Sequence, residues 1–269
     1  VASQGLDAEA ALTDIRLENL VSCTSFMLVD ELIIKWIIGR ELAEDKTATL
    51  SGMNIPELCD IRKRKHFGKT YAAAYDALVA GYELLQVTGF TPAQELSEIA
   101  AGYISADYKY DTYYRKFIAA IDALDDSSMF DDLKVLIQNI YQNDFLEKIV
   151  YAWNSAYVKD DQKAGLHLQS DFYRDKIASK KEKTVVIISD ALRYEATKEL
   201  SLKFQDDPNC EIDIGAMMGT LPSYTAVGMA ALLPHDELTM TEDKDHKVLV
   251  DGEPTTYTEQ KEKILKKAN

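Results

Sequence analysis

The sequence predicts a helical part over residues 1–178, followed by the opening of a mostly parallel α/β part over residues 184–269. In the first part, apolar residues recur at intervals of three and four, which is the spacing of one helix face. The polar and basic segment 176–183 then has the composition of a linker. Beyond it, the continuous β-branched run 184–189 (TVVIIS) is typical of a strand covered on both faces.

Four stretches of the first part carry the helical pattern: Leu17–Trp36, Tyr71–Leu85, Tyr110–Leu124 and Leu133–Tyr157. Breaks are expected near Ser51–Pro56, Gly89–Pro92 and Ala123–Ser128. The polar residues at 125–128 also offer an N-cap for the helix that follows. Because only 12 Gly and 6 Pro occur in 269 residues, long helices are favoured over a turn-rich β fold, and we expect a helical bundle.

Two features of the helical part leave alternatives open. Most of the 15 tyrosines lie there, where they could stack on bases or fill grooves between helices. The basic run Arg62–Lys65, followed by His66, could contact a phosphate or form a solvated helix end. The acidic composition and the helical spacing favour groove filling for the tyrosines, and we favour a solvated helix end for the basic run.

The charge and the cysteines exclude several classes of protein. With 30 basic and 45 acidic residues the net charge is −15, which does not support direct binding of nucleic acid through phosphate contacts. Cys23, Cys59 and Cys210 lie far apart and form no zinc or disulfide motif, which indicates free thiols in a reducing compartment, the cytoplasm. The apolar stretch Phe26–Ile38 is too short and too charged to span a membrane. Because the chain starts at Val1 in helical-looking sequence, we expect it to be cut from a longer protein.

The second part is expected to alternate strands and helices. After the strand at 184–189 we expect these elements in order: a helix over Ala191–Phe204, a strand over Glu211–Met218, a helix over Ala226–Leu233 and a helix over Thr258–Ala268. Strand, helix and strand at this spacing predict a right-handed βαβ unit. These strands are too few for a complete sheet, so we expect the remainder of the α/β domain to lie outside the sequence.

Asp190 is the first candidate for chemistry. It follows the expected buried strand directly, at the carboxyl end where open α/β sheets place their sites. A carboxylate there needs a cation or hydrogen-bond donors, which makes it a candidate metal ligand. It could equally cap a helix starting at Ala191, with Arg193 as its ion-pair partner. Spacing alone leaves both interpretations open.

Thr225 is the second candidate, in the string GTLPSYTAVGMAALLPH over 219–235. It falls at or beside the start of an expected helix, where amides and the helix dipole favour an anion. A threonine hydroxyl becomes a nucleophile only beside a base or a cation, and a metal held by Asp190 would be such a cation. Alternatively, Ser223 or Thr225 merely caps the helix, and spacing alone favours this cap.

Two strings change that balance, VVIISDALRYE over 185–195 and LPSYTAVGMAALLPH over 221–235. Together with the tail VLVDGEPTTYTEQKEKIL over 248–265, they resemble the PglZ family, a branch of the alkaline phosphatase superfamily. The resemblance implies an alkaline-phosphatase-like α/β domain preceded by a helical region, of which this sequence covers only the first part. Members of the family belong to bacterial antiviral systems, phage growth limitation and BREX, beside a DNA methyltransferase and ATPases.

The resemblance also implies roles for particular residues. Asp190 matches the superfamily's metal ligand, and Thr225 matches the nucleophile and metal ligand of its Pro-x-x-Thr string, which begins here at Pro222. Ser223 is the runner-up nucleophile, and Thr220 is taken as a loop residue.

The other polar residues of the strings receive no catalytic role. Arg193 and Glu195 belong to the family's string without a fixed role, and we expect them to support Asp190 or to lie on the helix surface. The superfamily completes a two-metal site with later Asp and His residues. After Thr225 this sequence offers two histidines, His235 and His246, plus scattered carboxylates, and neither histidine is expected to be a core ligand.

The function implied by the resemblance is that of a metal-dependent hydrolase. The intact parent would act as a phosphatase or phosphodiesterase, with zinc or manganese and a phosphothreonine intermediate, on a phosphate ester of unspecified identity. The fragment itself is expected to be inactive. The alternative is a non-catalytic assembly module that docks other proteins of the defence complex.

One geometric expectation follows for this chain. If Asp190 and Thr225 share a metal, their side-chain oxygens should lie within roughly 3–5 Å of each other. Both should lie at the carboxyl edge of the sheet, and Ser223 should point elsewhere.

Overall fold

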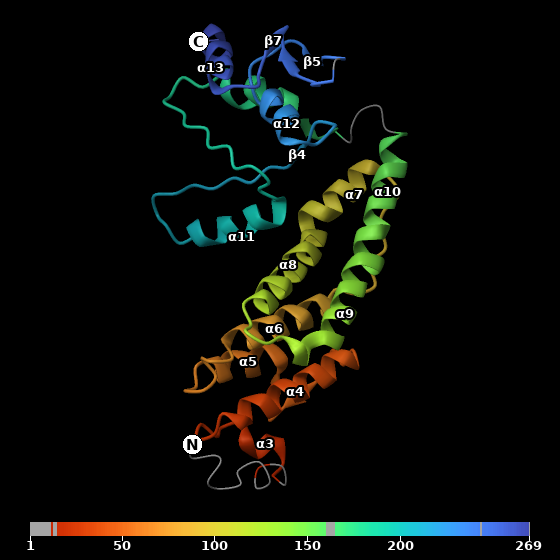
Figure 1. Cartoon of the computed structure of the whole chain (residues 1–269), viewed down its shortest axis with the longest axis vertical. Helices are drawn as coiled ribbons and strands as arrows, with labels where there is room; N and C mark the ends of the chain where they lie inside the picture. The colour runs from red at the N-terminus through yellow and green to blue at the C-terminus, as the bar shows by residue number, and fades with distance from the viewer. Residues whose placement is uncertain (1–11, 13–14, 160–164, 243, 269) are drawn as a thin grey trace. The chain divides into compact units, whose positions relative to one another are not determined.

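The computed structural model describes residues 12, 15–159, 165–242 and 244–268. The start of the expected helical part and residues 160–164 lie outside the described residues. The chain divides into two compact units between Ala156 and Tyr157. This division precedes the polar segment 176–183, whose role as a domain boundary stays a prediction. The fold is mixed and helix-rich with small sheets (Figure 1).

The first unit is built mainly of helices. Its elements are α3 (Leu17–Leu20), α4 (Leu28–Leu42), β1 (Thr49–Leu50), β2 (Met53–Asn54), α5 (Ile55–Lys63), α6 (Ala72–Gln86), α7 (Leu96–Gly102), η1 (Tyr103–Asp107), α8 (Tyr108–Asp122), η2 (Ser128–Phe130), α9 (Asp131–Asn139), η3 (Ile140–Leu146) and α10 (Glu147–Tyr157). All three expected breaks fall at helix boundaries: the first holds the β1–β2 turn and the start of α5, the second separates α6 from α7, and the third separates α8 from η2.

The start of α5 shows how the sequence sets one boundary. The Asn54 side chain accepts a hydrogen bond from the Glu57 backbone N–H at 2.9 Å, and the Glu57 carboxylate accepts one from the Asn54 N–H at 3.0 Å. This reciprocal capping box satisfies two amides that a helix start otherwise leaves without partners. Pro56 in the first turn costs no hydrogen bond because its position needs no donor.

One apolar core joins the helices of the first unit. Helix α6 packs against α4, α5, α8 and α9. Side chains with 0% exposure include Ile33, Leu78, Phe117, Leu133 and Ile137, from four different helices. Such complete burial is worth about 1.5–3 kcal/mol for each large apolar side chain, so this cluster holds the helices together. Independent folding of this region as a bundle stays a prediction.

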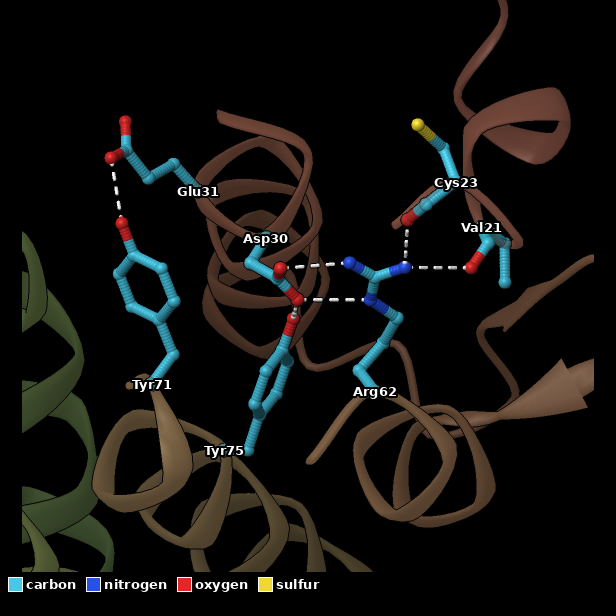
Figure 2. Close-up of polar contacts among 7 residues, drawn as sticks. All are labelled: Val21, Cys23, Asp30, Glu31, Arg62, Tyr71 and Tyr75. Carbon is cyan, nitrogen blue, oxygen red and sulfur yellow. Dashed lines mark hydrogen bonds and ion pairs between the residues drawn. The ribbon is translucent and has the colours of Figure 1, made fainter. Parts of the chain in front are cut away.

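A buried ion pair crosses that core, as Figure 2 shows. The Arg62 guanidinium donates to both carboxylate oxygens of Asp30, at 2.9 and 2.8 Å, and also to the backbone carbonyls of Val21 and Cys23. The Tyr75 hydroxyl donates to Asp30 at 2.6 Å, and burial, with the Asp30 carboxylate adjacent, raises the pKa of Tyr75. The expectation of a solvated helix end is therefore wrong for Arg62, which is 0% exposed, because its charge is fully paired inside the core.

The second unit combines short strands and helices. Its elements are β3 (His167–Leu168), η5 (Gln169–Asp171), η6 (Tyr173–Ile177), α11 (Tyr194–Phe204), β4 (Met217–Met218), α12 (Thr225–Ala231), β5 (Leu238–Met240), β6 (Val248–Val250), β7 (Glu253–Pro254) and α13 (Thr258–Ala268). Strands β3 and β4 pair in parallel, and β5, β6 and β7 form an antiparallel sheet. A small core gathers Val227 and Ala230 of α12, Val248 and Val250 of β6, and Ile264 of α13.

The structure corrects several expected elements of the second unit. The run 184–189 forms no strand, and its side chains at Val185 and Ile187 are 75% and 87% exposed. Of the expected strand at 211–218 only Met217–Met218 is formed, and it pairs in parallel with β3 rather than with 184–189, so the expected βαβ unit is not formed among the described residues. A β-branched run becomes a strand only when neighbouring strands satisfy its backbone groups, and the described residues offer none to 184–189.

The expected helices fare better than the expected strands. Helix α11 begins at Tyr194 rather than at Ala191, whose positive φ of 56° is incompatible with a right-handed helix. Helix α12 begins at Thr225, one residue early, and ends at Ala231, and α13 covers Thr258–Ala268 as expected. No helix among the described residues has the length and apolar character that crossing a membrane requires.

Candidate functional site

Asp190 lies on an exposed turn ahead of α11. The following residue, Ala191, has a φ of +56°, and the Leu192 N–H donates to the Ser189 carbonyl at 3.4 Å, so the chain reverses here. The N-cap position of α11 is Arg193, and its side chain makes no capping bond. Asp190 therefore does not cap this helix, and among the described residues no ion pair links it to Arg193.

Thr225 is the first residue of α12, and its side chain is exposed. The N-cap position is Tyr224, with no side-chain capping bond, and its carbonyl accepts from the Val227 and Gly228 N–H groups at 3.0 and 3.1 Å. The alternative in which Ser223 or Thr225 caps the helix is therefore wrong for this structure, because the cap position belongs to a residue between them.

The side chains of the two candidates, Asp190 and Thr225, lie in contact. The Thr225 hydroxyl lies 3.4 Å from Asp190 Oδ1 and 3.3 Å from Oδ2, as a long hydrogen bond across 35 residues of sequence. These distances fall inside the expected range. The expected position at the carboxyl edge of a sheet is wrong, because the run before Asp190 is not a strand. The roles of nucleophile and metal ligand stay predictions.

A residue that the sequence analysis missed supports the loop before Thr225. Gln169 Oε1 accepts from both the backbone N–H and the hydroxyl of Thr220, at 3.1 and 3.3 Å. Its Nε2 donates to the Gly228 carbonyl at 3.2 Å, so one amide joins the loop to α12. Thr220 is a loop residue, as expected. Gln169 belongs to no motif and lies 51 residues away from Thr220, so no sequence signal pointed to it.

A cavity of about 1070 Å³ opens beside Thr225. Apolar side chains make one part of its lining: Pro222, Tyr224, Met229, Met240 and Val248. Charged and polar side chains make another: Asp245, His246, Lys247, Thr256 and Lys261. Lys247 lies 3.3 Å from the Asp245 carboxylate. Thr225 therefore faces a space large enough for a small molecule, with both cationic and apolar surfaces.

The remaining candidates lie apart from this contact. His235 Nδ1 is 2.6 Å from the Leu233 carbonyl and lines a different cavity, whereas His246 lines the one beside Thr225. Glu195 is buried in α11, at 1% exposure, and Ser223 is exposed.

Asp190 and Thr225 fit a divalent cation only in part. A carboxylate and a hydroxyl oxygen are suitable ligands for a hard cation. Over residues 12, 15–159, 165–242 and 244–268, however, no three His, Cys, Asp or Glu side chains gather as a metal-binding group. The described residues therefore supply two adjacent oxygen ligands and not a complete centre.

The chain is similar to a known family model and to two known proteins. Residues 171–269 match the family model described as the BREX system PglZ alkaline phosphatase-like domain. The resemblance to the PglZ family is confirmed. The chain is 34% identical, over 265 residues, to the alkaline phosphatase-like protein PglZ of Bacillus cereus (strain H3081.97), covering 93% of this chain. It is 28% identical, over 268 residues, to the alkaline phosphatase-like protein BrxZ of Escherichia coli O9:H4 (strain HS), covering 92% of this chain.

The matches extend well beyond the PglZ domain. Both relatives align with the first unit as well as the second, since more than nine-tenths of the chain is covered. The chain spans 30% and 31% of the length of these relatives. No solved structure matches the chain.

Proposed function

We propose that Thr225 and Asp190 form the reactive part of a phosphoryl-transfer site, with Thr225 as the nucleophile. The observation that supports this most directly is the contact of the Thr225 hydroxyl with both Asp190 carboxylate oxygens, at 3.3 and 3.4 Å. Helix capping explains neither residue, because the cap positions are Arg193 and Tyr224. The printed names of the relatives, alkaline phosphatase-like proteins, agree with phosphate-ester chemistry.

The proposed reaction has two steps. Thr225 Oγ1 forms a bond to phosphorus while the bond from phosphorus to the ester oxygen breaks, and the departing oxygen keeps the electron pair and takes a proton from water. The Thr225 proton leaves through the Asp190 carboxylate, which already accepts its hydrogen bond, to water. In the second step a water oxygen forms a bond to phosphorus while the bond from phosphorus to Thr225 Oγ1 breaks. Oγ1 keeps the electron pair and takes a proton from the attacking water, which restores the hydroxyl, and phosphate leaves.

The metal requirement is part of the same proposal. Asp190 and Thr225 would hold zinc or manganese together with ligands from elsewhere in a longer polypeptide. A divalent cation at these oxygens lowers the pKa of a bound hydroxyl and neutralises charge on phosphoryl oxygens. We infer that this chain is one portion of that polypeptide, with the first unit as a helical bundle ahead of an alkaline-phosphatase-like α/β domain.

The proposed cellular system and protein partners rest on the family. The family description and the BrxZ relative support a place in a BREX-type antiviral system with several protein partners, and we propose that the protein works in the cytoplasm. The substrate is a phosphate ester. One observation favours a second function, a non-catalytic assembly module: among the described residues no three His, Cys, Asp or Glu side chains gather as a metal-binding group.

Phosphatase assays separate these functions. With zinc or manganese, the longer polypeptide should hydrolyse nitrophenyl phosphate esters, and this chain alone should show no appreciable turnover. Thr225→Ala should lower kcat by at least about a thousandfold, since a nucleophile is lost. Ser223→Ala is the matched control, and it should change kcat by less than about threefold because, among the described residues, Asp190 accepts its hydrogen bond from Thr225 and not from Ser223. No turnover with any ester, together with intact association with partner proteins, would favour the assembly module.

A further inference from the structure

The cavity beside Thr225 is lined by Lys261, a cation that has no ion pair among the residues that the structure describes. We propose that Lys261 binds the anionic group of a phosphate ester there, and that the apolar wall receives a flat apolar group of the same ester. That the anion is a phosphate ester rests on the proposed function. The binding site itself follows from the cavity and does not require a metal or catalysis.

Lys261 is distinguished from the other lysine of the cavity by its surroundings. Lys247 is already paired with Asp245 at 3.3 Å. The half-buried Lys261 has no ion pair or side-chain hydrogen bond with any residue that the structure describes. In a chain with net charge −15, a half-buried lysine with no ion pair among the described residues favours an anion from solution.

Two lysines of helix α13, Lys261 and Lys263, line different cavities. Lys261 lies in the first half of α13, and its neighbour Lys263 lines a separate cavity with Gln260 and Ile264. Lys263 is exposed, so the two lysines differ in burial and in the cavity they face. The helix thus offers a matched pair of lysines, of which only Lys261 lines the cavity beside Thr225.

The apolar wall indicates what the anion is attached to. Tyr224 is 41% exposed and its hydroxyl donates to the Met240 sulfur at 3.3 Å, so the hydroxyl end of the side chain contacts the thioether. Met229 adds a second flexible thioether. Aromatic rings and methionine side chains adapt to flat apolar groups and bind them face-on or edge-on. An aryl or nucleobase-bearing phosphate ester fits this combination better than inorganic phosphate does.

Titration of the whole chain with phenyl phosphate, in the presence of a chelator, tests the proposal without catalysis. Methionine methyl NMR signals provide the readout, with Met229 and Met240 assigned by replacement. Phenyl phosphate should shift both signals with a dissociation constant in the millimolar range. Lys261→Ala should weaken binding about tenfold, since one charge-assisted contact is lost, and Lys261→Arg should keep it within about threefold.

Matched variants decide the outcome. Lys263→Ala should bind phenyl phosphate as the unchanged chain does, and inorganic phosphate should bind more weakly than phenyl phosphate. Equal binding by Lys261→Ala and the unchanged chain, or shifts confined to other methionines, would overturn the proposal. Because the titration excludes metal and turnover, its failure would leave the assay of Thr225 unaffected, and a failed assay would leave this titration valid.

Discussion

In the first unit, side chains such as Ile33, Leu78 and Phe117 are completely buried, whereas in the second unit Val185 and Ile187 are 75% and 87% exposed. The helical core of the first unit and the run 184–189 of the second therefore differ sharply in how far their apolar side chains are buried. The helices of the first unit satisfy their own backbone groups, so they need only side-chain packing. An extended run needs a neighbouring strand before it can bury anything, and the run 184–189 has none among the described residues.

Carboxylates show the same contrast. Asp30, in the first unit, is 0% exposed and accepts hydrogen bonds from Arg62 and Tyr75. Asp190, in the second unit, is exposed, and its one side-chain hydrogen-bond partner among the described residues is the neutral hydroxyl of Thr225. A carboxylate that is already neutralised serves stability, and one that faces solvent beside a hydroxyl is available for chemistry.

The largest expected effect on stability comes from breaking the buried pair. Arg62→Ala should lower the free energy of unfolding by about 3–5 kcal/mol, because Asp30 would stay buried without its cation. Arg64→Ala is the matched control: Arg64 pairs with Asp60 at the surface, with side-chain exposures of 76% and 56%, and should cost less than about 1 kcal/mol. Chemical denaturation measures both, and equal losses would contradict the distinction.

Two isoleucines test the contrast in apolar burial. Ile137→Ala should cost about 2–5 kcal/mol because it leaves a cavity in the helical core, where Ile137 is 0% exposed. Ile187→Ala should change stability by less than about 0.5 kcal/mol, since that side chain is 87% exposed. A large loss at Ile187 in thermal or denaturant unfolding would show that the run 184–189 is packed against something.

Glu41 gives a pH-dependent effect inside the first unit. Burial raises the pKa of its carboxyl well above the ordinary value of 4.5, and neither oxygen has a hydrogen-bond partner among the described residues. Between these two pKa values the folded state keeps a proton on Glu41 that the unfolded state has lost. The contribution of Glu41 to the free energy of unfolding is therefore complete below the ordinary pKa of 4.5, and it is lost as the pH rises toward the raised pKa of the folded state.

Glu41→Gln should remove that dependence. Relative to the unchanged chain, the variant should become more stable as pH rises from about 5 to 7, by at most about 1.4 kcal/mol per pH unit. Denaturant unfolding at several pH values measures the difference. A difference that stays constant with pH would mean that Glu41 is ionised in the folded chain.

The prediction with the smallest expected effect concerns where a protease cuts the chain first. Limited proteolysis should cut first within 176–183, a polar segment that is largely exposed from Ala178 onward. Cutting within 130–160 instead would contradict this prediction, because much of that range is helical.

Local pattern predicted the helices well and the strands poorly. Helix α13 was predicted at both ends, because helices satisfy their own hydrogen bonds and their period is visible in sequence. The sequence wrongly predicted a strand at 184–189, because strand formation depends on pairing with distant segments. Asp190 and Thr225 were found through motifs, whereas Gln169 and Lys261 became visible only once the chain was folded. The burial of Arg62 was missed because its partner Asp30 lies 32 residues away.

The central claim is that Thr225 accepts a phosphoryl group. Its most direct test is to quench the longer polypeptide in acid during turnover of a phosphate ester and to locate the phosphate by mass spectrometry. We predict phosphothreonine at Thr225, none in Thr225→Ala, and a strong reduction in Asp190→Asn, whose amide replaces the contacting carboxylate. Phosphate on Ser223, or turnover that survives Thr225→Ala, would contradict the account.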